Sequence, residues 1–305
     1  MTINDCMEEF KTYIESYCAS ATIEYYTLNL HLFGRYLFEV YGTLDLEINV
    51  LKKKDFAGYI TYHRNRPVKN TSVRTYARAV KAFLKFCYNE GYLLEDITKN
   101  VKYPQADNAI IVPVSDCDIS LLENKILMTA LPERNICIFR LMLDCGLRLS
   151  EVVNLNLPDV DFTNHFIIIR NSKNSKSRLV PLPGKLESAI YDYLEVSGRN
   201  VNDSGCLFLQ NDGITRISKN AISIMFNRLK SVVPGIYPHL LRHTFATSFV
   251  LGGGSLEILR ILMGHENYNV TKQYLHIAGL FKIMNYDIYR LDDIFFKSYN
   301  YNKRE

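Results

Sequence analysis

The chain has no stretch of about 20 consecutive apolar residues, so we expect no membrane-spanning helix. Its first residues, MTINDCMEEF, carry acidic side chains where a secretory signal has a basic segment followed by an apolar run. Its seven cysteines are an odd set without a CxxC pair, which argues against a zinc site. We therefore expect a cytoplasmic protein with reduced thiols.

The length of 305 residues exceeds the size at which one hydrophobic core usually keeps growing, which favours two domains. The formal net charge of +4 is compatible with a nucleic-acid partner, but many other enzymes have a similar balance. Charge alone therefore does not decide the function.

The first hundred residues have the apolar spacing of helices. From Ile23 to Val40, apolar residues recur at intervals of three and four, and Gly42 follows as a stop. Similar patterns cover 3–18, 52–65 and 70–89. We predict an all-helical first domain.

Residues 101–115 contain two prolines and no clean periodicity, so we place the domain boundary there. Beyond it, HFIIIR (165–170) and SRLVPL (177–182) are β-rich runs around a polar turn, which indicates a β-hairpin. Helical patterns occupy 117–127, 133–145, 184–196, 218–230, 239–251, 255–263 and 268–275. The second domain should be mostly helical with a small sheet.

Four cations share one side of the helix predicted over 70–89: Arg74, Arg78, Lys81 and Lys85. Taken alone, such a stripe is better explained as an ordinary solvated face of the helix. The functional interpretation is contact with DNA phosphates.

Polar clusters in the second domain have no simple explanation as core or surface. They are GLRLSE with Arg148 and Glu151, the turn residue Lys173, PHLLRH with His239, Arg242 and His243, LMGH with His265, and Tyr274 nine residues later. Each residue alone has an ordinary structural explanation, and Tyr274 is one of 21 tyrosines.

The spacing of His239 and His243 invites a zinc interpretation, but the pair lacks the glutamate of HExxH. Two guanidiniums, an amine and imidazoles offer many hydrogen-bond donors, which suits the oxygens of a phosphodiester. A tyrosine beside them can serve as a covalent nucleophile. The residues thus indicate a phosphate-handling site that could carry out phosphoryl transfer.

In this order and wording the clusters resemble the tyrosine recombinase, or phage integrase, family. Its pattern is matched by Arg148, Lys173, His239, Arg242, His265 and Tyr274, in that order. The chain is similar to compact, Xer-like members with two domains, and we find no additional arm-type domain. The match is most specific in the second domain.

The resemblance implies strand exchange without a metal or other cofactor. Tyr274 would attack the scissile phosphate and form a 3′-phosphotyrosyl bond. Arg148 and Arg242 would hold the phosphate oxygens with help from His265, and His239 would help to take the tyrosine proton. Lys173 would protonate the leaving oxygen, while Glu151 would orient its neighbours and His243 would support the site.

The resemblance also implies a mostly α fold: a core-binding domain (1–105), a linker (106–115) and an α+β catalytic domain (116–305), forming a C-shaped clamp around DNA. A monomer when free, the protein would act as a tetramer on paired inverted-repeat sites in bacterial cytoplasm. Residues 288–297 would pack on a neighbouring subunit. The reaction would be integration, excision, inversion or resolution of DNA through a Holliday junction. Accessory or directionality proteins would be further partners, and the gene would belong to a mobile genetic element.

Two other functions stay open. A DNA-binding protein without catalytic activity could use the same scaffold, although all six positions are intact. A metal-dependent nuclease would need clustered carboxylates near the histidines, whereas this candidate site is rich in cations. Within the family pattern, spacing after LMGH favours Tyr274 over Tyr268, Tyr286 and Tyr289, and the glycines of LGGGSLEIL suggest a flexible link that lets it move.

Overall fold

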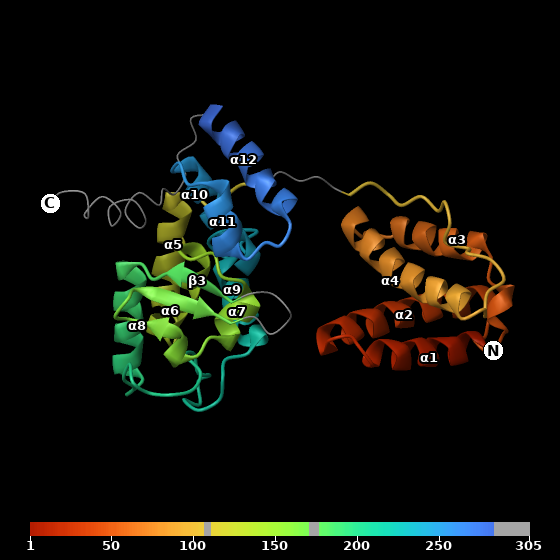
Figure 1. Cartoon of the computed structure of the whole chain (residues 1–305), viewed down its shortest axis with the longest axis horizontal. Helices are drawn as coiled ribbons and strands as arrows, with labels where there is room; N and C mark the ends of the chain where they lie inside the picture. Colours follow the sequence, from red (N-terminus) through yellow and green to blue (C-terminus); the bar gives the residue numbers. More distant parts are fainter. Residues whose placement is uncertain (107–110, 171–176, 284–305) are drawn as a thin grey trace. The chain divides into compact units, whose positions relative to one another are not determined.

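The computed structural model describes residues 1–106, 111–170 and 177–283. It is mostly helical, with one small antiparallel sheet, as the sequence predicts (Figure 1). The chain divides into two compact units, Met1–Ala109 and Ile110–Glu305, so the division falls inside the segment in which the linker is expected. Among the helices of the described ranges, none combines the length and apolar character that crossing a membrane requires.

The first unit is built from four helices, which confirms the helical prediction. They are α1 (Ile3–Glu15), α2 (Ser20–Tyr41), α3 (Lys53–Arg64) and α4 (Asn70–Asn89), with a short 3-10 helix η1 (Ile48–Val50) between α2 and α3. Aromatic rings dominate its core: Phe10 of α1 meets Phe83 and Phe86 of α4 edge-on at centroid distances of 5.7 and 5.3 Å. Such pairs bury large apolar areas and fix the helix packing.

The basic stripe on α4 is divided by the segment that follows the helix. Arg78 and Lys85 are exposed, whereas Arg74 and Lys81 are only partly exposed. Arg74 donates a hydrogen bond of 3.0 Å to the carbonyl of Pro104, and the Lys81 ammonium lies 5.9 Å from the ring centre of Tyr103. Two of the four cations are therefore engaged within the unit.

The second unit surrounds its small sheet with helices (Figure 1). The helices are α5 (Asp116–Leu127), α6 (Pro132–Leu143), α7 (Leu149–Asn154), α8 (Gly184–Val196), α9 (Lys219–Leu229), α10 (Pro238–Leu251), α11 (Leu256–Met263) and α12 (Tyr268–Ile283), with a 3-10 helix η2 (Leu157–Asp159). The antiparallel strands follow the order β1 (Val160–Asp161), β2 (Phe166–Ile169), β3 (Arg178–Pro181). The predicted hairpin is β2 and β3. Sequence periodicity missed β1 and α7 because two and six residues are too few to reveal a repeat.

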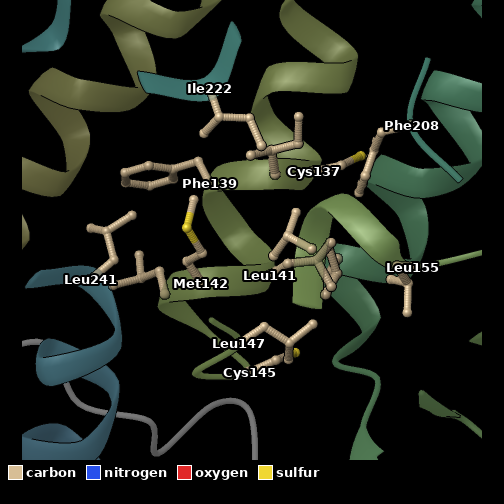
Figure 2. Close-up of a cluster of buried hydrophobic side chains, with 14 of the residues drawn as sticks. Cys137, Phe139, Leu141, Met142, Cys145, Leu147, Leu155, Phe208, Ile222 and Leu241 are labelled. Atoms are coloured by element: carbon tan, nitrogen blue, oxygen red, sulfur yellow. The ribbon is translucent and has the colours of Figure 1, made fainter. Parts of the chain in front are cut away.

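Helix α6 lies at the centre of the main core and holds α10 in place. Figure 2 shows Phe139 and Met142 of α6 beside Leu241 of α10, within one cluster of buried apolar side chains. Further along α10, Phe245 and Phe249 belong to a second cluster that includes Tyr274 of α12. Helix α10 is thus fixed on two sides, which makes it a rigid support for polar side chains.

The glycine-rich link between α10 and α11 is ordered by hydrogen bonds and close packing. Gly252 and Gly254 donate from their amides to the carbonyls of Ser248 and Phe249, at 2.9 Å each. Gly253 has a φ of 91°, and a side chain at Gly254 would collide with the ring of Phe249. Gly253 and Gly254 therefore need glycine for backbone geometry and for close packing.

Candidate active site

Arg148 is held at the start of α7 by the turn that follows α6. Gly146 has a φ of 65°, and a side chain there would collide with the ring of Phe245. Glycine therefore lets the chain turn tightly against α10. Arg148 is the residue that precedes the first turn of α7, and its side chain is 36% exposed. It is thus anchored in the backbone while its guanidinium remains accessible.

Glu151 connects two arginines through a buried carboxylate. It accepts from the Arg148 amide and guanidinium at 2.8 Å each. It also accepts two hydrogen bonds from Arg178 of β3, at 2.9 and 2.8 Å. Burial raises the pKa of Glu151, but the bonds and charges of Arg178 and Arg148 outweigh it and hold the pKa at about 2. Glu151 is therefore ionised and orients both guanidiniums.

The C-terminal end of α11 binds three arginines through three consecutive carbonyls. Arg178 donates to Leu262 at 2.6 Å, Arg242 donates to Met263 at 2.6 Å, and Arg148 donates to Gly264 at 3.0 Å. Carbonyls at a helix C-terminus lack partners within the helix and carry the negative end of its dipole. The LMG sequence thus gathers cations from α7, β3 and α10 at one point.

His265 follows this helix end and lies beside Arg242. A guanidinium N–H of Arg242 donates to Nε2 of His265 at 3.1 Å. Because a guanidinium cannot accept a hydrogen bond, Nε2 carries no proton. The proton is then on Nδ1, which lies 3.0 Å from the hydroxyl of Thr271. Burial, followed by the charges of Arg242 and Arg148, lowers the pKa of His265 to about 4. His265 is neutral at pH 7.

Arg242 is almost completely enclosed, with 1% of its surface exposed. Besides Met263 and His265 it donates to the carbonyl of Gly146. Burial, followed by the charge of Arg148, lowers its pKa to about 9. Two guanidiniums close together, one buried and one accessible, favour the arrival of an anion that neutralises them.

Tyr274 reaches the same place from α12. Its side chain is 1% exposed, and its ring lies parallel to that of His265 with centroids 6.4 Å apart. The hydroxyl lies 2.8 Å from Nδ1 of His243 on α10. Burial raises the pKa of Tyr274 to about 12, against the opposing effect of Arg242 and Arg148. The phenol of Tyr274 is therefore protonated at pH 7.

The partner of the tyrosine hydroxyl differs from the sequence-based expectation for His239. His239 is exposed, and its ring meets the ring of His243 edge-on with centroids 4.6 Å apart. His243, one residue after Arg242, is the histidine in contact with Tyr274. The sequence could not separate the two because residues four apart on a helix share a face.

The structure brings together most of the predicted site and adds one residue. Lys173 and the segment 288–297 lie outside the described residues, and the α4 stripe belongs to the first unit. The addition is Arg178, which sequence analysis missed. The alternating pattern of β3 offered a signal, because Arg178 occupies an inward position that it shares with Val180. A cation on the buried face of a strand needs a specific partner.

Within 1–106, 111–170 and 177–283, no three histidine, cysteine or carboxylate side chains are grouped in a way that could hold a metal ion. His239 and His243 contact each other and, through His243, Tyr274. The polar side chains that converge on this site with Tyr274 are the cations Arg148 and Arg242 and the neutral imidazoles of His243 and His265. This donor set suits a phosphate group in a transfer reaction.

Comparison with known proteins supports the same chemistry. The sequence pattern of the phage integrase family matches residues 120–279, which contain the whole site. "Tyrosine recombinase XerC" of Chlamydia trachomatis serovar L2 is 30% identical over 239 residues, covering 74% of this chain and 72% of the relative. "Tyrosine recombinase XerA" of Thermococcus onnurineus is 29% identical over 283 residues, covering 90% and 92%.

Solved structures share the fold at low sequence identity. The Tn1549 transposon integrase in complex with a circular intermediate DNA has a TM-score of 0.71 at 20% identity, covering 90% of this chain and 95% of that one. A lambda integrase dimer bound to a COC′ core site has the same score at 13% identity, covering 90% and 95%. The chain therefore belongs to the phage integrase family, and it is a tyrosine site-specific recombinase, an enzyme that cleaves and rejoins DNA.

Proposed function

We propose that Tyr274 is the nucleophile that cuts and rejoins DNA in this recombinase, with Arg148, Arg242 and His265 around the scissile phosphate. The observation that carries the proposal is the convergence of the four side chains at the C-terminal end of α11. A phosphate bound there would meet a fixed set of donors, and fixed donors stabilise developing charge without reorganisation.

The reaction follows from the groups present. The Tyr274 oxygen forms a bond to phosphorus as the bond from phosphorus to the 5′-oxygen breaks, which leaves a 3′-phosphotyrosyl ester. The phenol gives its proton to the neutral imidazole of His239, and the leaving 5′-oxygen gains one from Lys173. Because the ester keeps the energy of the original linkage, a second 5′-hydroxyl can attack it and reseal the strand without a metal or other cofactor.

The remaining residues have supporting roles in this proposal. Glu151 holds Arg148 and Arg178 in their orientations, as its four hydrogen bonds indicate. His239 is exposed and lies three residues before Arg242 on α10, which suits contact with a phosphate oxygen. Partial burial and the charges of Arg242 and Arg148 lower its pKa, so its imidazole is neutral at pH 7 and can accept the Tyr274 proton.

In this proposal the substrate is double-stranded DNA, and the other partners are further copies of the same chain. The division into 1–105, 106–115 and 116–305 provides a DNA-binding domain whose α4 contacts phosphates, chiefly through the exposed Arg78 and Lys85. Four copies exchange strands between two inverted-repeat sites through a Holliday junction, with 288–297 packing on the next copy. The support is the likeness to integrases solved on circular intermediate DNA and on a core site.

A nicked duplex tests the proposal directly. DNA carrying inverted repeats from beside the gene is nicked next to the cleavage position, so that the cut end diffuses away and the covalent adduct accumulates. Wild-type protein should form an adduct that resists denaturation, with and without EDTA. Tyr274→Phe should form none and still bind the DNA, while the exposed Tyr268→Phe should behave as wild type.

Three results would overturn the proposal. An adduct formed by Tyr274→Phe would assign the nucleophile to another residue. Strand cleavage that needs a divalent metal and leaves no adduct would favour the nuclease alternative, and DNA binding without any cleavage by wild type would favour the inactive DNA-binding protein.

A further inference from the structure

His243 is a buried histidine to which the six-residue family pattern gives no role. Its side chain belongs to α10, where it directly follows Arg242, and the residue is 8% exposed. Nδ1 lies 2.8 Å from the hydroxyl oxygen of Tyr274, and the two ring centroids are 5.5 Å apart. The contact joins α10 to α12 across residues that are 31 apart in the sequence.

The direction of this hydrogen bond follows from the acidity of the two groups. Burial, followed by the nearby His239 and the charge of Arg242, lowers the pKa of His243 to about 4, so its imidazole is neutral at pH 7. A phenol is the stronger acid and a neutral imidazole nitrogen is the stronger base. The Tyr274 hydroxyl therefore donates, and Nδ1 of His243 accepts.

We propose that His243 is a positioning residue that fixes the Tyr274 hydroxyl beside Arg242 for attack on phosphorus. With the hydroxyl proton directed at Nδ1, the oxygen lone pairs are left free to face a phosphate held by Arg242 and Arg148. Because His243 and Arg242 are neighbours on one rigid helix, the same backbone sets the position of the nucleophile and of the phosphate. The proposal rests on the assignment of Tyr274 as the nucleophile.

Orientation fits the observations better than removal of the proton. The phenol of Tyr274 has a pKa raised to about 12, while the imidazolium of His243 has a pKa of about 4. A proton would have to move strongly uphill to reach His243 before the attack begins. An acceptor that does not titrate near pH 7 holds the hydroxyl in one direction over the whole working range.

Asparagine and glutamine provide a matched pair of variants at this position. The Asn side chain can place its amide oxygen near the position of Nδ1, whereas Gln places its amide near Nε2, on the far side of the ring. Both are neutral and polar. His243→Asn should therefore keep the hydrogen bond to Tyr274, and His243→Gln should lose it, as should His243→Leu.

The experiment measures the single-turnover rate of adduct formation on the nicked duplex at saturating protein, with DNA affinity and thermal unfolding determined for each variant. His243→Asn should stay within about threefold of wild type, and its rate should follow the wild-type pH profile between about pH 6 and 9. His243→Gln and His243→Leu should fall by about 10- to 100-fold, which is the effect of one hydrogen bond to a reacting group. DNA affinity should not change.

Three outcomes would overturn the inference. They are a wild-type rate for His243→Gln and His243→Leu, an equal loss for Asn and Gln, and an altered pH profile in His243→Asn, which would indicate proton transfer. If His243→Leu does not fold, the Asn and Gln pair still decides. Adduct formation by Tyr274→Phe under the same conditions would instead refute the nucleophile assignment, so the two failures are distinguishable.

Discussion

The two units of this chain bury different kinds of side chain. In the first, aromatic rings fill the core, and Phe33 meets Tyr59 and Phe83 edge-on at 5.1 and 6.4 Å between centroids. Several of its buried polar atoms have no hydrogen-bond partner among the described residues, including the hydroxyl of Tyr59 and Nε2 of His63. In the second, the guanidiniums of Arg178 and Arg242 are buried at 7% and 1% exposure and hydrogen-bonded to carbonyls or carboxylate.

The difference shows how strictly each unit fixes the positions of its buried side chains. An aromatic core stabilises by area and shape, and a polar atom left without a partner costs about 1–3 kcal/mol. A buried cation costs far more unless each donor is paired, so the second unit is held in one arrangement around α11. Substitutions should therefore reduce stability in the first unit and both stability and catalysis in the second.

The largest effect should come from Glu151→Gln, which removes the charge between Arg148 and Arg178. Breaking a buried ion pair by changing one partner costs about 3–5 kcal/mol, because the other charge stays buried. Urea unfolding should show this loss, together with slower adduct formation. Glu257→Gln is the matched control, since Glu257 forms an exposed pair with Arg260 and its loss should leave the urea midpoint nearly unchanged. Equal effects of the two substitutions would contradict the comparison.

A smaller effect should appear on acidification. The folded-state pKa of His243 is about 4, below its ordinary value of 6.5, so the unfolded chain binds more protons between these values. Stability is then full above pH 6.5 and falls as the pH drops toward 4. Between pH 7.5 and 5, His243 alone should account for a loss of about 2 kcal/mol in the free energy of unfolding. His243→Asn should remove this part of the pH dependence, and an unchanged slope would show that His243 is protonated in the folded protein.

Phe33→Leu tests the aromatic core of the first unit. The smaller side chain leaves a cavity beside Tyr59 and should destabilise the protein by about 1–2 kcal/mol in urea unfolding. The rate of adduct formation at saturating DNA should stay at the wild-type value, because the chemistry depends on the second unit. A slower rate at saturation would mean that the first unit shapes the active site.

The smallest change in stability should accompany Arg78→Gln on α4. Because the side chain is exposed, the free energy of unfolding should change by about 0.5 kcal/mol or less. Loss of one phosphate contact should reduce the slope of log affinity against log salt by about 1. Lys11→Gln on α1 is the control and should leave the slope unchanged. The opposite pattern would move the DNA contact from α4 to α1.

Sequence reasoning located most of the fold because long elements repeat their apolar residues many times. The long helices α2 and α4 show this periodicity, whereas β1 and α7 contain too few residues to do so. The triple carbonyl contact at α11 was also hidden, because a sequence shows that LMGH ends a helix but not which cations its carbonyls bind.

The site was predictable to the extent that its residues form an ordered pattern. Arg148, Arg242, His265 and Tyr274 were predicted in that way, and their side chains lie together in the structure. Arg178 was missed because it holds Glu151 through a contact between distant segments. Such a contact produces no regular spacing of residues in the sequence. The choice between His239 and His243 needed the position of α12, which only tertiary packing sets.

The central claim is that Tyr274 forms the covalent bond to DNA, and peptide mapping tests it most directly. The adduct from the nicked duplex is digested with protease and nuclease, and mass spectrometry locates the tyrosine that carries the nucleotide remnant. The account predicts the modification on Tyr274. A modified Tyr268, which is 46% exposed on the same helix, or a modified tyrosine elsewhere in the chain, would contradict it.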